Sequence, residues 1–132
     1  MSPGMSQENK THKILIVDDD SVVLRLVESL LKNKGYQVTT AFEAPVGLEV
    51  AINQRPDLII LDVMMPIING FNICRLIKSE HGHKHIPIIL LTSRASEEDR
   101  QIGMQVGADA YMAKPLDTEK LLNTIQELLV KV

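Results

Sequence analysis

The stretch Ile14-Leu15-Ile16-Val17-Asp18-Asp19-Asp20 decides the fold, because four consecutive apolar residues lead directly into three acidic ones. A run without polar alternation is typical of a strand that is buried on both faces of a sheet. A second run, Leu58-Ile59-Ile60-Leu61, ends in the same way at Asp62. Carboxylates gathered at one edge repel one another unless a cation neutralises them, so the pattern indicates a hard divalent metal with oxygen ligands.

Apolar runs alternate with stretches of helical spacing along the rest of the chain. The pattern predicts strands at residues 14–17, 58–61 and 86–91, with weaker ones at 37–41 and 110–113. Helices are predicted at 21–34, at 44–54, from 69 onward, from 96 to about 107, and from 117 to the end. Since parallel strands need crossover helices, this order predicts an α/β fold, a doubly wound five-stranded parallel sheet with helices on both faces.

The composition fits one domain and excludes several classes of protein. The chain has 132 residues, and its 17 acidic residues against 14 basic ones give a net charge of −3, which argues against a nucleic-acid-binding surface. No apolar stretch approaches the length of a membrane helix, so no membrane contact is expected. One cysteine suits a reducing compartment, and we predict a cytoplasmic protein. Residues 1–12 are polar and predicted to be disordered, which leaves 13–132 as the domain.

Polar residues that follow the apolar runs are expected to meet at one edge of the sheet, where ligands bind in open α/β folds. They are Asp18, Asp19, Asp20, Asp62, Thr92, Ser93 and Lys114. We expect Asp20 only to start the following helix. A carboxylate can attack phosphorus as a nucleophile, while a metal and a lysine ammonium stabilise charge on the phosphoryl oxygens. Together with the Thr92 hydroxyl, these groups indicate a phosphoryl-transfer site.

Four motifs in order carry a family resemblance that covers about residue 12 to the end. They are Ile14-Leu15-Ile16-Val17-Asp18-Asp19, Leu61-Asp62-Val63-Met64-Met65-Pro66 with Gly70, Leu91-Thr92-Ser93, and Gly107-Ala108-Asp109-Ala110-Tyr111-Met112-Ala113-Lys114-Pro115. The chain resembles the response-regulator receiver domain of two-component signalling. The resemblance implies the flavodoxin-like strand order 2-1-3-4-5.

The resemblance also implies a role for each acid of the site. Asp62 would be the phosphoacceptor. Mg²⁺ (or Mn²⁺) would be held by Asp62, by Asp19 directly, by Asp18 largely through water, and by the backbone carbonyl of Met64. Magnesium suits this set, since it takes few protein oxygens and keeps some of its waters.

Further residues are implied to act in switching. Thr92 would be the switch hydroxyl, Lys114 would bind the phosphoryl group, and Tyr111 would be the switch aromatic. Lys114 and Pro115 would be joined by a cis peptide bond, which proline makes accessible. Phosphorylation would draw Thr92 toward the phosphoryl group and turn Tyr111 inward, which would reshape the face formed by the fourth helix, fifth strand and fifth helix.

Two positions tune the lifetime of the phosphoryl group in this family, and here they hold Met64 and Arg94. A methionine cannot orient an attacking water by hydrogen bonding, so we hypothesise slow self-hydrolysis.

The implied function is a phosphorylation-activated signalling switch that assists only its own phosphorylation and dephosphorylation and is otherwise no enzyme. The donor would be a sensor histidine kinase, a histidine phosphotransfer protein or a small phosphodonor, and a protein effector would bind the output face. Since no effector sequence follows the last helix, a stand-alone regulator is expected. The alternative is a receiver excised from a larger regulator with a cyclase, kinase or DNA-binding output.

Other functions fit the residues less well. A metal-dependent aspartyl phosphatase generally has a second acid two residues after its nucleophile, where this chain has Met64. A flavin-binding protein of similar fold needs a first loop rich in Ser, Thr and Gly rather than three acids. We expect His81, His83 and His85 to lie in a solvated loop and Cys74 to be a packed core thiol, and we keep Met104 open as an output-surface residue.

Overall fold

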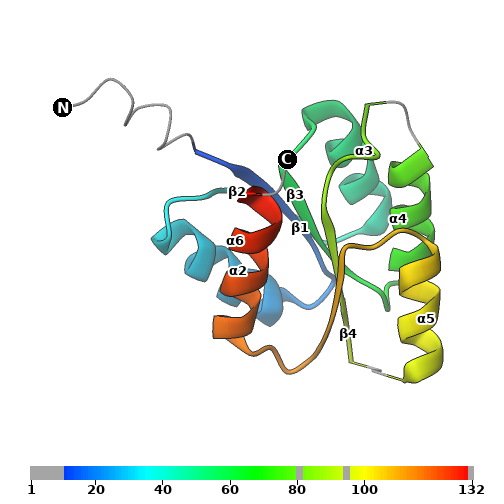
Figure 1. The fold of residues 1–132 in the computed structure, drawn as a ribbon. Helices are drawn as coiled ribbons and strands as arrows, with labels where there is room; N and C mark the ends of the chain where they lie inside the picture. The colour runs from blue at the N-terminus through cyan, green and yellow to red at the C-terminus, as the bar shows by residue number, and fades with distance from the viewer. Residues whose placement is uncertain (1–10, 80–81, 94–95, 131–132) are drawn as a thin grey trace.

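Five parallel strands form one sheet in the order β2-β1-β3-β4-β5, which confirms the predicted α/β fold and strand order (Figure 1). The structure, a computed structural model, describes residues 11–79, 82–93 and 96–130. The strands are β1 (Lys13–Val17), β2 (Gln37–Ala41), β3 (Leu58–Asp62), β4 (Ile88–Thr92) and β5 (Ala110–Ala113). The helices are α2 (Ser21–Asn33), α3 (Ala44–Gln54), α4 (Gly70–Ser79), α5 (Glu97–Gln105) and α6 (Thr118–Val130).

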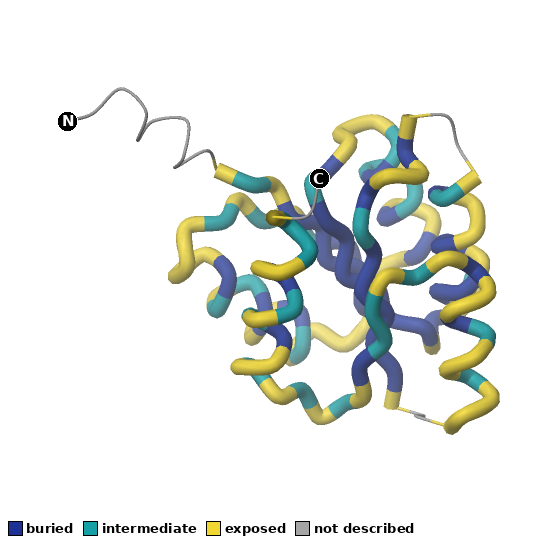
Figure 2. The backbone as a smooth tube through the Cα atoms, in the orientation of Figure 1, coloured by how far each residue is buried: buried dark blue, intermediate teal, exposed yellow. Residues whose placement is uncertain are grey.

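The helices cover both faces of the sheet, with α2 and α6 on one side and α3, α4 and α5 on the other (Figure 1). Side chains alternate across each strand, so Ile14 and Ile16 pack with α2 and α6, whereas Leu15 and Val17 pack with α3 and α4. Every residue of β3 and β4 is buried, as Figure 2 shows for the centre of the molecule. The unbroken apolar runs are therefore explained by burial on both faces.

Side-chain oxygens cap α2 and α5 where these two helices leave the carboxyl edge of the sheet. Oδ1 of Asp20 accepts hydrogen bonds from the backbone N–H groups of Val22 at 2.9 Å and Val23 at 3.3 Å, which confirms Asp20 as the residue that starts α2. The hydroxyl of Ser96 accepts from the N–H of Asp99 at 3.1 Å and caps α5.

The segment before β4 differs from the sequence-based expectation. The strand begins at Ile88 rather than at residue 86, because Pro87 has no N–H to give to a strand ladder. His83 is buried, with 4% of its surface exposed, and its Nε2 lies 2.9 Å from the carbonyl oxygen of Ile52 near the end of α3. The expectation of a solvated histidine loop was wrong for His83, while His85 is exposed and His81 lies outside the described residues.

The predicted disorder of residues 1–12 concerns residues that lie mostly outside the described part of the chain. Of these residues, Thr11 and His12 are described, and the carbonyl oxygen of His12 accepts a hydrogen bond from the N–H of Gln37 at 3.0 Å.

Candidate functional site

The register of the parallel strands brings the polar residues of three strand ends to one edge. Val17 pairs with Leu61, and Asp62 pairs with Leu91, so the acids after β1 and at the end of β3 come together. Carboxylate oxygens of Asp18, Asp19 and Asp62 all lie within 4.8 Å of one another. Asp18 and Asp62 are buried, with 0% and 3% of their surfaces exposed, whereas Asp19 is exposed. The cluster therefore combines two buried acids with one exposed acid.

Among the described residues, Lys114 is the one basic residue whose side chain forms ion pairs with this cluster. Its Nζ lies 2.8 Å from Oδ2 of Asp18 and 3.6 Å from Oδ1 of Asp62. Its backbone N–H donates to the carbonyl oxygen of Thr92 at 2.7 Å, which ties the end of β5 to the end of β4. The Lys114–Pro115 peptide bond is cis, as the resemblance implies.

The loop after β3 contacts the Asp62 carboxylate through a backbone hydrogen bond. The N–H of Met64 donates to Oδ1 of Asp62 at 3.2 Å, and the N–H of Gly70 donates to the carbonyl oxygen of Val63 at 2.9 Å. A Cβ at position 70 would overlap the carbonyl oxygen of Asp62 and lie 2.8 Å from Cα of Val63. Only glycine lets α4 begin this close to the end of β3, which explains a motif residue to which the sequence assigned no role.

The surroundings of Asp62 disfavour its charged form. Burial raises the pKa of the Asp62 carboxyl from 3.8 to about 7, and the charge of Asp18 adds to the rise. The ammonium of Lys114 and the N–H of Met64 oppose it. Burial by itself would lower the pKa of Lys114, but the carboxylates of Asp18 and Asp62 outweigh burial and raise it. Lys114 therefore stays cationic, while Asp62 lacks enough positive charge around it.

The donor set suits a divalent cation. Beyond its ion pair with Lys114, Oδ2 of Asp18 has no hydrogen-bond partner among the described residues, although it is fully buried. The cluster has three carboxylates but only the ammonium of Lys114 in ion-pair contact among the described residues, so its negative charge is not neutralised. Clustered carboxylate oxygens are the ligands that Mg²⁺ prefers, and the residues present therefore fit such an ion.

The remaining predicted site residues lie on β4, β5 and the loop after β3. Thr92 is fully buried at the end of β4, and Tyr111 is half-buried on β5, where it pairs with Leu90. Met64 is exposed beside Asp62, and Arg94 lies outside the described residues. The structure thus brings the acids and Lys114 into contact, and it places Thr92 at the same strand edge.

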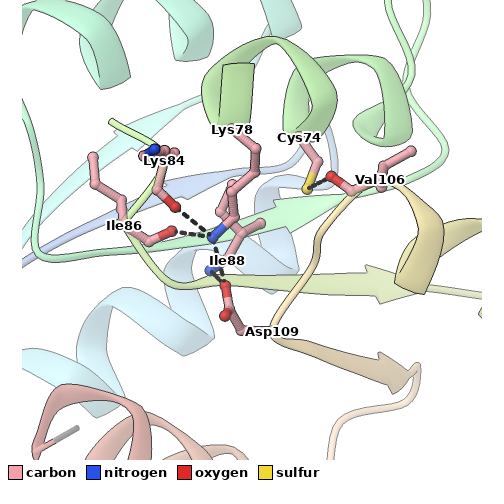
Figure 3. Close-up of polar contacts among 7 residues, drawn as sticks. All are labelled: Cys74, Lys78, Lys84, Ile86, Ile88, Val106 and Asp109. Carbon is pink, nitrogen blue, oxygen red and sulfur yellow. Dashed lines mark hydrogen bonds and ion pairs between the residues drawn. The ribbon is translucent and has the colours of Figure 1, made fainter. Parts of the chain in front are cut away.

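A polar cluster on the opposite edge fixes the start of β5 (Figure 3). The ammonium of Lys78 donates to the carbonyl oxygen of Ile86 at 2.7 Å and lies 2.8 Å from Oδ2 of Asp109. The same oxygen of Asp109 accepts from the N–H of Ile88 at 2.9 Å. Sequence reasoning quoted Asp109 within a motif but missed this role, because its partner lies 31 residues away.

Comparisons with known proteins agree with this geometry. The family model of the response regulator receiver domain matches residues 14–126. The chain belongs to the response regulator receiver family. Receiver domains are signalling switches, and the predicted family membership is thereby confirmed.

Individual relatives are similar over almost the whole chain. The response regulator PleD of Caulobacter vibrioides is 39% identical over 116 residues, which cover 88% of this chain but 26% of PleD, so the chain spans about a quarter of that relative. The chemotaxis protein CheY4 of Vibrio cholerae is 37% identical, with a TM-score of 0.85 over 91% of this chain and all of the other.

A second similar structure holds a metal. The receiver domain of the sensor histidine kinase PA1611 from Pseudomonas aeruginosa, solved with a magnesium ion coordinated in its active site cleft, is 30% identical. It has a TM-score of 0.85 over 92% of this chain and all of the other.

Within the described part of the present chain, none of the helices combines the length and apolar character that a membrane span requires. A cytoplasmic location stays a prediction.

Proposed function

We propose that the chain is a phosphorylation-controlled switch in which Asp62 accepts a phosphoryl group. The observation that carries the proposal is the convergence of Asp18, Asp19 and Asp62 within 4.8 Å, with Lys114 ion-paired to the two buried acids. A buried carboxylate whose pKa is raised, beside a lysine and two further acids, is a functional arrangement rather than a stabilising one.

The chemistry follows from the positions of these groups. An oxygen of the Asp62 carboxylate attacks phosphorus, the bond from phosphorus to the donor's histidine nitrogen breaks, and that nitrogen keeps the electron pair. The product is an acyl phosphate on Asp62 and a donor histidine that takes up a proton. The ammonium of Lys114, which lies 3.6 Å from Asp62, would stabilise charge on a transferring phosphoryl oxygen.

Asp18, Asp19 and Asp62, with the backbone carbonyl of Met64, would hold Mg²⁺ or Mn²⁺. When bound, the ion supplies positive charge that offsets both the carboxylates and the phosphoryl oxygens. Proposed magnesium binding is supported by the buried Oδ2 of Asp18 and by the magnesium ion in the related PA1611 receiver domain.

The proposed response runs from Thr92 to Tyr111. The hydroxyl of Thr92 would bond a phosphoryl oxygen, and Tyr111 would turn toward the space beside Thr92. The two strands are already joined there, because the N–H of Lys114 donates to the carbonyl oxygen of Thr92. The change would reach the face formed by α5, β5 and α6, where Met104 is 70% exposed and offers an apolar contact to a protein effector.

The proposed phosphodonor is a protein that presents a phosphohistidine, such as a sensor histidine kinase or a histidine phosphotransfer protein. Asp62 is buried, so the donor must fit closely against this edge of the sheet for its phosphohistidine to reach the carboxylate. Large exposed apolar side chains follow the carboxyl ends of β1, β2 and β3, and they are Val22, Phe42, Val46, Met64 and Ile67. Apolar side chains on this side of a charged centre suit a partner that excludes water while its histidine enters.

Labelling with acetyl phosphate and Mg²⁺ tests the proposal directly. Intact-mass measurement should show one added phosphoryl group on the wild type and none on Asp62→Asn. Asp57→Asn is the matched control, because Asp57 precedes the same strand at its opposite end and should leave labelling intact. Undiminished labelling of Asp62→Asn would overturn the acceptor assignment.

A further inference from the structure

Gly103, in the last turn of α5, lies against the ring of Tyr111. A Cβ at position 103 would be 3.0 Å from Cδ1 and 3.4 Å from Cε1 of Tyr111, and 3.3 Å from Cδ1 of Leu90. Ordinary contacts between carbon atoms lie at about 3.5–4.0 Å, so a methyl group would press on the ring. Because Gly103 has no side chain, one edge of the Tyr111 ring can occupy the space beside it.

The backbone gives no reason for a glycine here. Gly103 has no left-handed φ, in contrast to Gly35, Gly82 and Gly107, so alanine could adopt its conformation. Glycine within a helix is less favourable than alanine, because it loses more conformational freedom on folding. The glycine therefore makes α5 less stable than alanine would. The close approach of the Tyr111 ring is the feature of the structure that explains a glycine at this position.

The ring lies between a fixed neighbour and a hollow. Leu90 is fully buried in β4, so it cannot yield to a displaced ring. Tyr111 packs against the core and also lines a hollow of about 200 Å³ between α5 and β5, together with Arg100, Gly103 and Met104. The hollow gives the ring space in which to move, but the ring cannot keep its present place beside a larger residue 103.

We propose that Gly103 is a positioning residue that sets the balance between two places of the Tyr111 ring. The proposal rests on the proposed function, in which Tyr111 turns toward Thr92 when Asp62 is phosphorylated. Tyr111 pairs with Leu90, and Thr92 lies two residues farther along β4, so the turn carries the ring along the strand and away from residue 103. The space at Gly103 thus stabilises the resting place and holds the switch off.

The consequence is a shift of the resting equilibrium in Gly103→Ala. The methyl group raises the free energy of the resting place and leaves the turned place unaffected. A phosphoryl mimic that binds the turned state then binds more tightly, because less free energy is spent on the conformational change. Coupling of the usual size predicts at least about a five-fold gain in apparent affinity for beryllofluoride with Mg²⁺.

Tyrosine fluorescence provides the readout. The chain has two tyrosines and no tryptophan, so Tyr36→Phe leaves Tyr111 as the only fluorophore. In that background, Gly103→Ala should shift the ligand-free emission toward that of the beryllofluoride-bound parent, and titration should show the tighter binding. Gly103→Ser, which also adds a Cβ, should act in the same direction. Unchanged emission and affinity in both folded variants would overturn the proposal.

Two controls separate this role from a general effect on α5. Gln101→Gly changes the helix preference of an exposed position away from Tyr111 and should leave beryllofluoride affinity unchanged. In a Tyr111→Leu background, read out by labelling with acetyl phosphate, Gly103→Ala should no longer alter the response. An equal effect with and without Tyr111 would refute the ring contact. If the Tyr36→Phe parent itself failed to bind beryllofluoride, the proposed function would be overturned as well. If the parent bound it and the Gly103 variants behaved like the parent, only the role of Gly103 would be overturned.

Discussion

The ammonium nitrogen of Lys114 lies 2.8 Å from Oδ2 of Asp18, and this ion pair joins the end of β5 to the end of β1. Asp18 is fully buried and Lys114 is mostly covered, so water screens the pair weakly. Lys114 is also 3.6 Å from Asp62, and its one charge therefore serves two acids. A phosphoryl group on Asp62 would compete with Asp18 for the same ammonium.

Replacing Lys114 should slow phosphoryl transfer. Lys114→Met removes a cation that would stabilise the transferring oxygens, and loss of one such donor typically costs about 10²-fold in rate. The measurement is the rate of labelling of Asp62 by acetyl phosphate at saturating Mg²⁺. Lys120→Met, an exposed change on α6, should leave the rate unchanged. Equal rates for Lys114→Met and the wild type would show that Lys114 has only a structural role.

Magnesium should stabilise the fold through Asp18 and Asp19. An ion that binds only the folded chain adds about 2.7 kcal/mol to the unfolding free energy at a free concentration one hundred times its Kd. Thermal or urea unfolding with and without Mg²⁺ measures this gain. Asp18→Asn and Asp19→Asn should each lose most of it, whereas Asp20→Asn should keep it, because asparagine still caps α2. A gain lost equally in all three variants would contradict the division of roles.

The contribution of Asp62 to the stability of the metal-free protein should fall as pH rises from about 4 to about 7. The pKa of Asp62 is raised from 3.8 to about 7 in the folded chain, so the folded state holds a proton that the unfolded state has released. Its stabilising contribution is complete below the unfolded pKa and is lost as pH passes the folded pKa.

Asp62→Asn should therefore flatten that pH dependence and stabilise the metal-free protein at pH 8, by on the order of 2 kcal/mol. Urea unfolding in the presence of a chelator checks both the slope and the gain. Asp57→Asn serves again as the control, since Asp57 precedes β3 at the end opposite to Asp62. Equal pH slopes for the wild type and Asp62→Asn would contradict the raised pKa of Asp62.

The sequence predicted most of this fold because its information is local. The unbroken apolar runs indicate buried strands, and the acids that follow them indicate a shared edge of the sheet. Both patterns can be recognised within a few consecutive residues. The strand order came from the family resemblance, because apolar runs of similar length do not reveal which strand pairs with which. Boundaries were less certain, as at β4, where Pro87 moves the start of the strand to Ile88.

What the sequence could not predict depends on contacts between distant residues. His83 is buried because the end of α3 supplies the carbonyl oxygen of Ile52, and no pattern around His83 indicates this. The space at Gly103 has meaning only once Tyr111 is known to lie across from it. Ile67 has a φ of +75°, a conformation that favours glycine, although the sequence there has a β-branched residue.

Ile67→Gly should stabilise the fold. A β-branched residue at positive φ costs roughly 1–3 kcal/mol, and Ile67 is 85% exposed, so little buried area is lost. After allowance for the greater freedom of glycine in the unfolded chain, we expect a gain of about 1 kcal/mol in urea unfolding. Ile68→Gly is the matched control and should destabilise, because Ile68 packs against the core and has no positive φ. Loss of stability in Ile67→Gly would mean that the side chain contributes more than its conformation costs.

Met64→Asn should shorten the lifetime of the phosphorylated protein. The side chain of Met64 is 45% exposed, and its backbone N–H donates to the Asp62 carboxylate, so residue 64 stands where water would approach the proposed acyl phosphate. A thioether is a weak acceptor and donates no hydrogen bond, whereas an amide can orient an attacking water, and we expect decay about 10-fold faster. Decay is followed by intact mass after removal of acetyl phosphate. Met64→Leu, which keeps the apolar character, should decay like the wild type, and equal decay of Met64→Asn and Met64→Leu would sink the hypothesis that Met64 slows hydrolysis.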